Sequence, residues 1–558
     1  MPKITFINKQ KTVMIAEGST ILDAARSAGI EIESPCNALG SCGKCKVKIP
    51  NPEHLGHLKI VESKHSVSAA ELADGIVLAC QTIPSADIEV IIKDYKEENS
   101  SLRILTEGNS FAYEQLPYIT KRPKLNSTEV YGGDTLIGVE EGNTLELLYA
   151  IALDIGTTTI VAALIDLRTG IQIASNSILN PQAAYAQDVL SRIHFASNPE
   201  GLNTLYRSFI DALNAMIGDL VVQNKINASN IYEIVFSGNT TMIHLATGVN
   251  PYSLGQYPYT PQIYGGNHIS AESIGVSISP FGLIYLPPII SAYVGADITS
   301  GILVSRLDEI KGTVLFIDIG TNGEMALVKN GKLAVTSTAA GPAFEGMNIS
   351  CGMRASKGSI ESFNVDSKGI FSFEVIGGGD PAGICGSGLL DIAGELVRTG
   401  VIGPSGRFVL PDSGTYSDFL KESFKEKNGK KVFFLSPDVY LAQKDIRQIQ
   451  LAKSAIRSGI EMLLSYFNLS SDTIDAVEIA GSFGYHLNEA SLINLGLLPQ
   501  AFIGKVKFTG NTSLSGAKAF LLNVGFREKM KSLVKKIETV ELAKESEFEK
   551  MFIKYMGF

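Results

Sequence analysis

The sequence predicts a multidomain α/β protein with a small β-rich domain at its N-terminus, a linker and two related α/β lobes. At 558 residues the chain is too long for a single hydrophobic core. Four of its six cysteines lie within the first eighty residues, which marks a separate module there. From Ile151 onward apolar strands alternate with helical segments, as they do in α/β folds.

Residues 1–95 carry the elements of a β-grasp domain. Two short apolar runs within residues 3–15, joined by a polar turn, predict a hairpin. A helix follows, with Ser19 or Thr20 as its N-cap and apolar residues along one face. A cysteine-rich loop comes next, and residues 87–93 form a last strand. Hairpin, helix, loop and returning strands together suit this small fold.

The four N-terminal cysteines have the spacing of a metal-cluster site, C-x5-C-x2-C and then a fourth after 34 intervening residues. They are Cys36, Cys42, Cys45 and Cys80. Soft thiolates select either iron–sulfur clusters or zinc, and four of them complete the coordination shell of either. The ligand type alone therefore leaves three possibilities, which are an iron–sulfur cluster, a zinc site and a disulfide pair.

The loop between the first three cysteines favours iron–sulfur. Gly40 and Gly43 permit positive φ angles, so the backbone can wrap around inorganic sulfides and aim N–H groups at them. The fourth cysteine lies at the start of a distant strand, whereas structural zinc sites usually combine two CxxC pairs. We therefore predict a [2Fe–2S] cluster held by the four thiolates.

The remaining chain divides into a linker and two lobes. Residues 96–149 read as a linker with a few strands, because their start is charged and Leu-Pro and Arg-Pro breakers follow. Residues 150–310 and 311–558 form the predicted first and second lobes. Segments 151–164 and 315–328 look alike, since each is an apolar strand that ends in Asp-Ile-Gly-Thr and turns into a second strand. This similarity predicts duplicated lobes.

Further elements of the lobes follow from hydrophobic periodicity. Residues 200–224, 386–399 and 444–467 have helical spacing, and the C-terminal segment 526–546 is also helix-like, with a solvated face of Lys and Glu. The most apolar stretch, residues 281–304, is broken by prolines, glycines and one aspartate. It therefore predicts buried sheet and turn, and no membrane span.

The two repeated hairpins carry the residue types of a phosphate site. Glycine lets the backbone approach a polyphosphate, and threonine hydroxyls donate to its oxygens. An aspartate at the end of a strand can hold hydrated Mg²⁺. The first hairpin supplies Asp154, Gly156, Thr157, Thr158 and Thr159, and the second supplies Asp318, Gly320, Thr321, Asn322, Gly323 and Glu324. Two later glycine turns add Gly386, Ser387, Gly388, Gly481, Ser482, Phe483 and Gly484.

Composition excludes several classes of function. The chain has 48 Lys and Arg against 57 Asp and Glu, a net charge of −9, which argues against nucleic acid as a partner. The first residues lack the layout of a secretory signal, and six cysteines in so long a chain are no disulfide scaffold. We therefore expect a cytoplasmic protein with no membrane association.

The order of these motifs resembles a known family. The two Asp-Ile-Gly-Thr hairpins and the later Ala-Gly-Ser-Phe-Gly turn resemble the phosphate and adenosine motifs of the acetate and sugar kinase, Hsp70 and actin superfamily. Within it, an N-terminal [2Fe–2S] domain joined to such an ATPase resembles the reductive activators of corrinoid proteins. The resemblance covers nearly the whole chain, including residues 236–248, 287–301, 341–346 and 383–391.

The resemblance implies a fold and an activity. The fold would be a β-grasp ferredoxin domain, a linker and a two-lobed actin-like ATPase; some members carry a larger middle domain than residues 96–149 provide. The activity would be ATP-dependent reduction of a corrinoid protein from Co(II) to Co(I) by one electron from the cluster. Asp154 and Asp318 would contact Mg²⁺ and phosphate through water, Glu324 would position the attacking water, and Gly481–Gly484 would border the adenosine.

The resemblance also implies cofactors and partners. The cofactors are the [2Fe–2S] cluster and ATP with Mg²⁺. The partners are the corrinoid protein of a methyltransferase system and an upstream electron donor such as a ferredoxin or flavoprotein, with the chain itself as a homodimer.

Two other functions remain open at this stage. Activators of radical dehydratases and aryl-CoA reductases share such an ATPase, but they hold a [4Fe–4S] cluster with cysteines of the ATPase lobes. Here only Cys351 and Cys385 lie in those lobes, and a ferredoxin module would be redundant. A redox-regulated metabolite kinase would need a catalytic base and a polar substrate pocket, and the sequence identifies neither.

Overall fold

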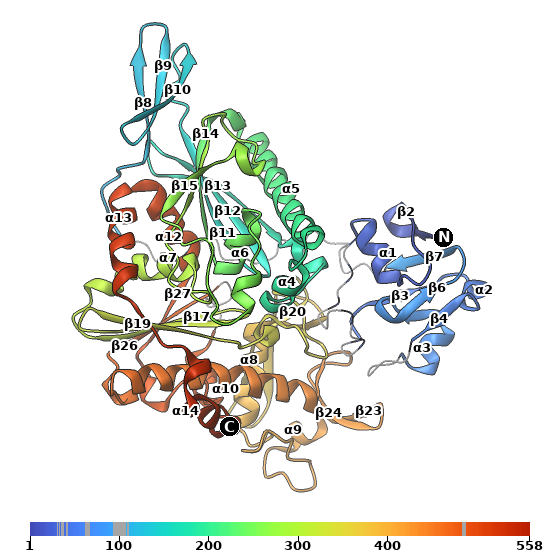
Figure 1. The fold of residues 1–558 in the computed structure, drawn as a ribbon. Coiled ribbons are helices and arrows are strands. Elements are labelled where there is room, and N and C mark those ends of the chain that lie inside the picture. The colour runs from blue at the N-terminus through green and yellow to red at the C-terminus, as the bar shows by residue number, and fades with distance from the viewer. Residues whose placement is uncertain are drawn as a thin grey trace. The chain divides into compact units, whose positions relative to one another are not determined.

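The structure is a computed structural model that describes residues 1–30, 32, 34, 38, 40, 43–61, 67–92, 108, 111–481 and 487–558. The chain forms two units, one of Met1–Ser100 with Pro181–Phe195 and the other of Ser101–Asn180 with Ala196–Phe558. Figure 1 shows the elements of both.

The first unit is built on a five-stranded mixed sheet in the order β2-β1-β7-β3-β5. Its strands are β1 (Lys3–Phe6), β2 (Lys11–Met14), β3 (Lys46–Lys48), β5 (Ile76–Leu78) and β7 (Ile88–Ile92), and β4 (Leu58–Ile60) pairs separately with β6 (Thr82–Pro84). Helices α1 (Ile21–Ser27), α2 (Pro52–Leu55) and α3 (Ala69–Ala73) accompany the sheet. This arrangement confirms the predicted β-grasp domain.

Helix α1 shows how local sequence shapes this unit. Thr20 caps it, accepting a hydrogen bond from the Asp23 backbone N–H, while the Asp23 carboxylate accepts one from the Thr20 backbone N–H. Ile21 and Leu22 are buried in the core beneath the sheet. The predicted cap and apolar face of this helix are therefore confirmed.

Residues 181–195 lie within the predicted first lobe of residues 150–310 and cluster in space with the N-terminal unit. Their elements are a 3₁₀ turn at Pro181–Ala184 and helix α4 (Val189–Phe195). The Arg26 Nε donates to the Ala184 carbonyl at 2.9 Å, a long-range contact that sequence periodicity does not report.

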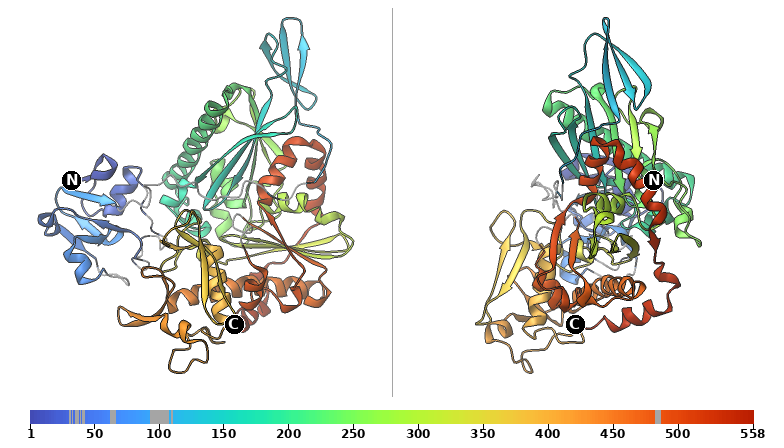
Figure 2. Two further views of the ribbon diagram at one scale, coloured as in Figure 1. Left: turned by 180° about the vertical axis from the view of Figure 1, so that it is seen from behind. Right: turned by 90° about the vertical axis from the view of Figure 1, so that its left-hand side faces the viewer.

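The second unit begins with a small antiparallel sheet of β8 (Ile119–Lys124), β9 (Ser127–Gly132) and β10 (Thr135–Glu141). It projects from one end of this unit in every view (Figures 1 and 2). These strands lie within the segment predicted to be a linker with a few strands.

The first lobe is a six-stranded sheet in the order β13-β12-β11-β14-β16-β15. Its strands are β11 (Tyr149–Ile155), β12 (Thr159–Asp166), β13 (Gln172–Leu179), β14 (Ile231–Gly238), β15 (Asn267–Ser270) and β16 (Leu283–Leu286). Its helices are α5 (Pro199–Asn224), α6 (Thr240–Ala246) and α7 (Ala296–Val304). β11 pairs antiparallel with β12 and parallel with β14.

The second lobe repeats this plan in the order β27-β26-β17-β18-β19-β28. Its sheet contains β17 (Thr313–Ile319), β18 (Gly323–Lys329), β19 (Lys332–Thr338), β26 (Ala476–Ala480), β27 (Val506–Gly510) and β28 (Glu538–Thr539). Like β11, β17 pairs antiparallel with the next strand and parallel with a later one, β26. Equivalent neighbours on both sides of β11 and β17 match the predicted duplication.

The other elements of the second lobe cover or extend its sheet. The helices are α8 (Gly386–Arg398), α9 (Asp418–Glu422), α10 (Gln443–Tyr466), α11 (Glu489–Asn494), α12 (Thr512–Leu522), α13 (Val524–Leu533) and α14 (Ser546–Lys554). The additional strands are β20 (Ser359–Val365), β21 (Phe371–Val375), β22 (Gly383–Ile384), β23 (Phe424–Lys427), β24 (Lys430–Phe434) and β25 (Tyr440–Leu441). Helices α5, α8 and α10 confirm the three long helical segments predicted from periodicity.

Helices α7 and α12 join the two lobes. They pack on each other, and α12 also packs on β11 and β14 of the first lobe, although it follows the second lobe in sequence. One hydrophobic core contains Ile298 of α7, Phe520 of α12 and Phe316 of β17. The helices lie between the two sheets in Figure 1.

Two predicted segments differ from the structure. The C-terminal segment 526–546 is not one helix: α13 ends at Leu533, and Glu538–Thr539 pairs with the edge strand β19, whose backbone groups it satisfies. The apolar stretch 281–304 contains β16 but also helix α7, so the expectation of sheet and turn was wrong for its second half. Among the described residues, no helix is both long and apolar enough to cross a bilayer.

Candidate functional site

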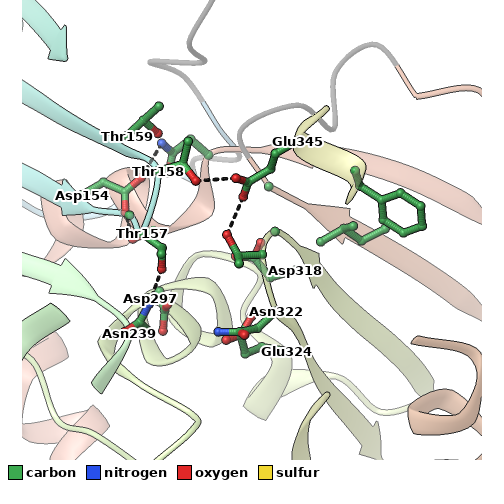
Figure 3. A pocket seen from close by; sticks show the side chains of 18 of the residues that line it. Asp154, Thr157, Thr158, Thr159, Asn239, Asp297, Asp318, Asn322, Glu324 and Glu345 are labelled. Carbon is green, nitrogen blue, oxygen red and sulfur yellow. Dashed lines mark hydrogen bonds between the residues drawn. The ribbon is translucent and has the colours of Figure 1, made fainter. Parts of the chain in front are cut away.

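A cavity of about 170 Å³ lies in the second unit at the carboxyl ends of the central strands of both lobes. The ends of parallel strands are where ligands bind in open α/β sheets. Its walls include Asp154, Gly156, Thr157, Thr158, Thr159, Asn239, Asp297, Asp318, Ile319, Gly320, Thr321, Asn322, Glu324, Phe344, Glu345, Arg354, Ala355, Gly386, Gly481, Asn511, Thr512 and Ser513. Figure 3 shows the main polar side chains.

The structure brings most of the predicted phosphate residues to this cavity. The two hairpins turn in the same way: the Gly156 N–H donates to the Thr159 carbonyl, and the Gly320 N–H donates to the Asn322 carbonyl, both at 2.9 Å. Gly481 also lines the cavity. Its φ is +125°, and a Cβ there would lie 2.5 Å from the Ile319 carbonyl oxygen, so only glycine lets this turn approach the second hairpin.

Other predicted residues lie elsewhere. Gly323 packs beneath Thr338 and Ile456, and Gly388 packs on the Ile360 carbonyl. The Ser387 hydroxyl donates to the Glu361 carbonyl at 2.8 Å, so of this turn only Gly386 is among the cavity residues. Ser482, Phe483 and Gly484 lie outside the described residues, as do Cys36 and Cys42.

Five carboxyl groups line the cavity, and four of them, Asp154, Asp297, Asp318 and Glu324, have perturbed pKa values. Burial, together with the nearby Asp297 and Asp154, raises the pKa of Asp318 to about 8. Burial and the neighbouring Asp154 raise the pKa of Asp297 to about 7. Burial, Asp297 and Asp318 hold the pKa of Glu324 well above its usual range. Carboxylates that share a site without water repel one another. Protonation of some of them, or a cation bound between them, relieves this repulsion.

Asp154 differs because it is hydrogen-bonded. Ser513 Oγ donates to its Oδ1 at 2.6 Å, and Asn511 Nδ2 donates to its Oδ2 at 2.8 Å. Burial raises the pKa of Asp154, and these two donors oppose that shift. Both donors begin helix α12, so the second lobe holds the key aspartate of the first lobe in place.

Sequence reasoning missed several of these residues although a signal existed. Residues 236–241 and 508–513 are similar, Phe-Ser-Gly-Asn-Thr-Thr and Phe-Thr-Gly-Asn-Thr-Ser. Each ends a strand and places an asparagine as the N-cap of the next helix, Asn239 for α6 and Asn511 for α12. Asn239 Nδ2 also donates to Thr157 Oγ1 at 3.1 Å. The two copies lie on non-equivalent strands, β14 and β27, so they are outside the lobe duplication.

Asp297 and Glu345 were also missed. Asp297 is a lone charge in the most apolar stretch of the sequence, and such a residue is buried only where it has a role or a partner. Glu345 belongs to the Gly-Pro-Ala-Phe-Glu-Gly stretch that carried the family resemblance. It accepts hydrogen bonds from Thr158 Oγ1 and, at 2.7 Å, from Thr321 Oγ1.

The first unit holds a second candidate site at Cys45 and Cys80. Both thiols are buried, and their sulfur atoms are 3.3 Å apart. A disulfide needs about 2.05 Å, so this distance leaves two separate thiols. The antiparallel pairing of β3 with β5 brings them together, because Cys45 precedes β3 and Cys80 follows β5. Two thiolates so close suit ligation of one metal ion.

Neighbouring groups support this sulfur pair. Gln81 Nε2 donates to the Ala38 carbonyl at 2.8 Å and lies 3.5 Å from Cys80 Sγ. It therefore links the cysteine-rich loop, which contains Ala38, to the segment that carries Cys80. Burial lowers the pKa of Arg26, and negative charge on Cys80 and Cys45 opposes that shift. A guanidinium close to the thiolates favours an anionic group there.

Three family profiles match the chain in sequence. They are the "2Fe-2S iron-sulfur cluster binding domain" at residues 4–85, the "RACo middle region" at residues 149–310, and the "C-terminal domain of RACo the ASKHA domain" at residues 312–558. A solved structure, the "Reductive activator for corrinoid,iron-sulfur protein", is 30% identical with a TM-score of 0.73, and the match covers 100% of this chain and 98% of that one. The chain belongs to the family of reductive activators of corrinoid proteins.

Two further relatives of this reductive activator agree. The corrinoid activation enzyme RamQ of Eubacterium limosum is 29% identical over 557 residues, 93% of each chain. The [Co(II) methylated amine-specific corrinoid protein] reductase of Methanosarcina barkeri is 25% identical over 427 residues, 70% of this chain and 73% of that protein. The family expected from the motifs is thereby confirmed, as is the ferredoxin domain joined to a two-lobed actin-like ATPase.

The reductive activator uses a [2Fe–2S] cluster and ATP with Mg²⁺, as predicted. Its residues fit both groups. Cys45 and Cys80 present two adjacent buried sulfurs, and the matched cluster domain spans all four predicted ligands. Within the described ranges, no three acidic, His or Cys side chains converge tightly enough to hold a metal by themselves. Mg²⁺ keeps several waters and binds through one or two carboxylates and phosphates, and the cavity offers the carboxylates of Asp154 and Asp318.

Proposed function

We propose that this reductive activator transfers one electron to the cobalt of a corrinoid protein, converting Co(II) to Co(I), in a step coupled to ATP. The observation that carries the proposal is the combination, in one chain, of a cluster-binding domain with an ATP cavity between two lobes. The similarity to corrinoid activators over 93% of the chain or more supports the same reaction.

The need for ATP follows from redox thermodynamics. For a one-electron transfer, each 59 mV of uphill potential costs a factor of about ten in the equilibrium constant. The C-x5-C-x2-C spacing differs from that of plant-type clusters, whose potential is about −400 mV, but even a donor in that range needs coupling to reduce an acceptor of much lower potential. A conformational change driven by nucleotide between the lobes can favour the reduced form of the partner.

The chain's own groups divide this work. When bound, the cluster supplies one-electron chemistry. Cys45 and Cys80, with Cys36 and Cys42, hold it, and Arg26 places positive charge beside the sulfurs. Electron balance is simple: the reduced protein loses one electron as the cobalt gains one, and an upstream donor restores it.

In the ATP cavity, Asp154 and Asp318 would hold Mg²⁺ through water, and the Thr157–Thr159 turn, Thr321 and Asn322 would contact the phosphates. Gly386 and Gly481 border the nucleotide. Asp318 pairs with Glu324 across its hairpin, whereas Asp154 pairs with Val161 across the equivalent one. A carboxyl on one side alone suits a single attacking water, so we assign Glu324 the role of positioning it.

The partners follow from the same reaction. The electron acceptor is the corrinoid protein of a methyltransferase system, and the electron donor is a one-electron carrier such as a ferredoxin or flavoprotein. We also propose a homodimer, which light scattering on the purified protein would test. Four reduced thiolates are stable in the reducing cytoplasm, which is where we place the reaction.

A spectroscopic assay tests this function. The chemically reduced protein is mixed with a Co(II) corrinoid protein, with and without ATP and Mg²⁺, and the visible spectrum is followed for Co(I). We expect Co(I) to form only when nucleotide and metal are both present. A control lacking the cluster, Cys80→Ser, should give no Co(I).

Two outcomes would contradict the proposal. Co(I) formation that is equally fast without ATP would remove the coupling. ATP-dependent phosphorylation of a small metabolite, with no cobalt reduction, would favour the kinase alternative. The alternative of a cluster on the ATPase lobes has little support, since Cys385 is buried and its thiol contacts the Ile360 carbonyl at 3.2 Å.

A further inference from the structure

Glu345 joins the two hairpins that carry the predicted phosphate residues. Its two carboxylate oxygens accept hydrogen bonds from Thr158 of the first lobe and from Thr321 of the second, the latter at 2.7 Å (Figure 3). A carboxylate between two hydroxyls offers the same acceptor pattern as two oxygens of a phosphate group. It therefore occupies the place that the proposed function gives to a phosphate.

The two hydroxyls cannot serve both groups. A threonine hydroxyl has one hydrogen to donate, and Glu345 already takes the hydrogen of both Thr158 and Thr321. A phosphate oxygen at the same position would also meet the negative charge of Glu345 in a cavity that contains four other carboxyl groups. The carboxylate and the phosphate therefore compete for the same donors.

Glu345 lies on a turn whose backbone is tightly constrained. The turn Pro342–Glu345 is bounded by Gly341 and Gly346, with φ of +79° and +77°. A Cβ on Gly386 would lie 1.7 Å from the Phe344 carbonyl oxygen, so the turn is wedged against the start of α8. The backbone that carries Glu345 is therefore held in place against the start of α8.

The segment that follows returns to the cavity at Arg354. A Cβ on Gly346 would lie 2.4 Å from the Met353 carbonyl oxygen, so residues 346–353 close a loop. Both ends of this loop, Glu345 and Arg354, line the cavity with opposite charges. An incoming phosphate repels one end and attracts the other.

The closed loop also has contacts away from the cavity. The backbone N–H and the hydroxyl of Ser350 donate to Asp445 Oδ1 at 2.8 and 3.0 Å, and Asp445 lies in the first turn of α10. The Met353 N–H donates to the Ile384 carbonyl of β22 at 2.9 Å. A shift of Glu345 would therefore act on a largely buried loop that is attached to two elements of the second lobe.

We propose that Glu345 takes the place of a phosphate in the nucleotide-free protein, that ATP displaces it, and that loop 346–353 changes conformation as a result. The proposal rests on the proposed function, because it requires ATP in this cavity. Glu345 thus opposes the binding of ATP in the cavity. Its displacement by ATP changes the conformation of loop 346–353.

The affinity for ATP tests this proposal, because loss of the Glu345 carboxylate should strengthen binding if Glu345 competes with phosphate and weaken binding if Glu345 holds the nucleotide. Glu345→Gln keeps the size of the side chain but removes its charge, so ATP should bind at least about fivefold more tightly than to the natural protein. Glu345→Asp keeps the charge but is too short to reach both hydroxyls, and it should also bind ATP more tightly. Glu374→Gln removes an exposed carboxylate from the same lobe and should leave affinity unchanged. Calorimetric titration with ATP, Mg²⁺ present, measures all four proteins.

Hydrogen exchange gives an independent readout. The Gly346 and Met347 N–H groups donate to the Ala343 and Pro342 carbonyls of the turn. We expect ATP to accelerate their exchange in the natural protein, and Glu345→Gln to show fast exchange without ATP. Unchanged exchange in both cases would overturn the conformational part of the proposal.

The possible failures are distinguishable. If Glu345→Gln binds ATP more weakly than the natural protein, Glu345 is part of the phosphate or Mg²⁺ site and this proposal is wrong, while the ATP site stands. If the natural protein binds no ATP at all, the proposed function fails and the role of Glu345 fails with it.

Discussion

Asp318 and Glu324 face each other across the second hairpin, and no equivalent pair exists on the first. This asymmetry is the main chemical difference between two otherwise similar strand turns. In the first lobe the partner of Asp154 is the buried Val161, which can neither hold nor move a proton. Chemistry at the ATP cavity is therefore expected to depend on the second lobe more than on the first.

Replacing Glu324 tests this dependence. Glu324→Gln should lower the turnover number of ATP hydrolysis by about 10²- to 10⁴-fold, because the positioning of the attacking water is lost. ATP affinity should change little, since Glu324 is not placed on the phosphates. Phosphate release and nucleotide titration measure the two effects, with Glu374→Gln as the surface control. Equal losses in affinity and turnover would assign Glu324 to binding instead.

The raised carboxyl pKa values predict a pH dependence of folding stability. Asp318 has a pKa of about 8 and Asp297 of about 7, against 3.8 as the usual value. Between those limits the folded protein keeps protons that the unfolded chain has lost, so the free energy of unfolding falls as pH rises through 7 and 8. Thermal melts of the nucleotide-free protein from pH 5 to 8.5 should show this decline, and Asp318→Asn should reduce it.

Binding of Mg²⁺ and ATP should reverse the protonation. A cation favours the ionised carboxylates, so binding at pH 7 should release about one proton or more. Calorimetry in two buffers of different ionisation enthalpy measures the release. Identical heats in both buffers would show that these carboxyls are already ionised in the free protein.

At the scale of elements, helix α13 is tied to the first lobe by a buried ion pair. Arg527 Nη1 and Nη2 donate to the two oxygens of Glu233 on β14, at 2.8 and 2.9 Å, and both side chains are almost fully buried. His268 Nε2 lies 2.8 Å from the same carboxylate. Opposite charge from Arg527 and His268 lowers the pKa of Glu233 and outweighs the effect of burial.

Breaking one side of this pair should be costly. Arg527→Met leaves Glu233 buried without its main partner, and we expect a loss of about 3–5 kcal/mol in the free energy of unfolding. The double variant Arg527→Met with Glu233→Gln should be less destabilised than the sum of the two single variants. Urea unfolding of the four proteins checks this cycle. Simple additivity would mean that the two side chains stabilise the fold independently.

At the scale of the whole molecule, cluster and nucleotide belong to different units. Cys45 and Cys80 lie in the first unit, whereas the described residues of the ATP cavity all belong to the second. The two cofactor sites therefore share no described side chain. Each should form when the other is damaged.

Cys80→Ser tests this independence. The variant should lose the visible absorbance and most of the iron of the [2Fe–2S] cluster, because Cys45 and Cys80 are adjacent ligands. Its affinity for ATP should stay within about twofold of that of the natural protein, since sites without shared partners behave additively. Iron analysis and nucleotide titration provide the measurements. A large loss of ATP binding would show that the cluster supports the fold of the ATPase lobes.

How far the sequence could predict this protein depends on whether a feature is local. The capped helix α1 and the two Asp-Ile-Gly-Thr hairpins depend on neighbouring residues, so propensity, periodicity and turn chemistry were enough to find them. The four-cysteine spacing predicted the cluster for the same reason. The prediction of one helix for the C-terminal segment 526–546 was wrong because the pairing of β28 with the edge strand β19 overrides the helical composition of that segment.

By itself, then, the sequence determined the β-grasp domain, the duplicated lobes, the strand-end aspartates and the family. Only the tertiary structure decided that Asp297 joins these aspartates, that Asn511 and Ser513 hold Asp154 from across the lobes, and that Glu345 bridges the two hairpins. The physical reason is distance along the chain. Hydrogen bonds and charge repulsion between residues up to 359 positions apart leave no periodic trace in a single sequence.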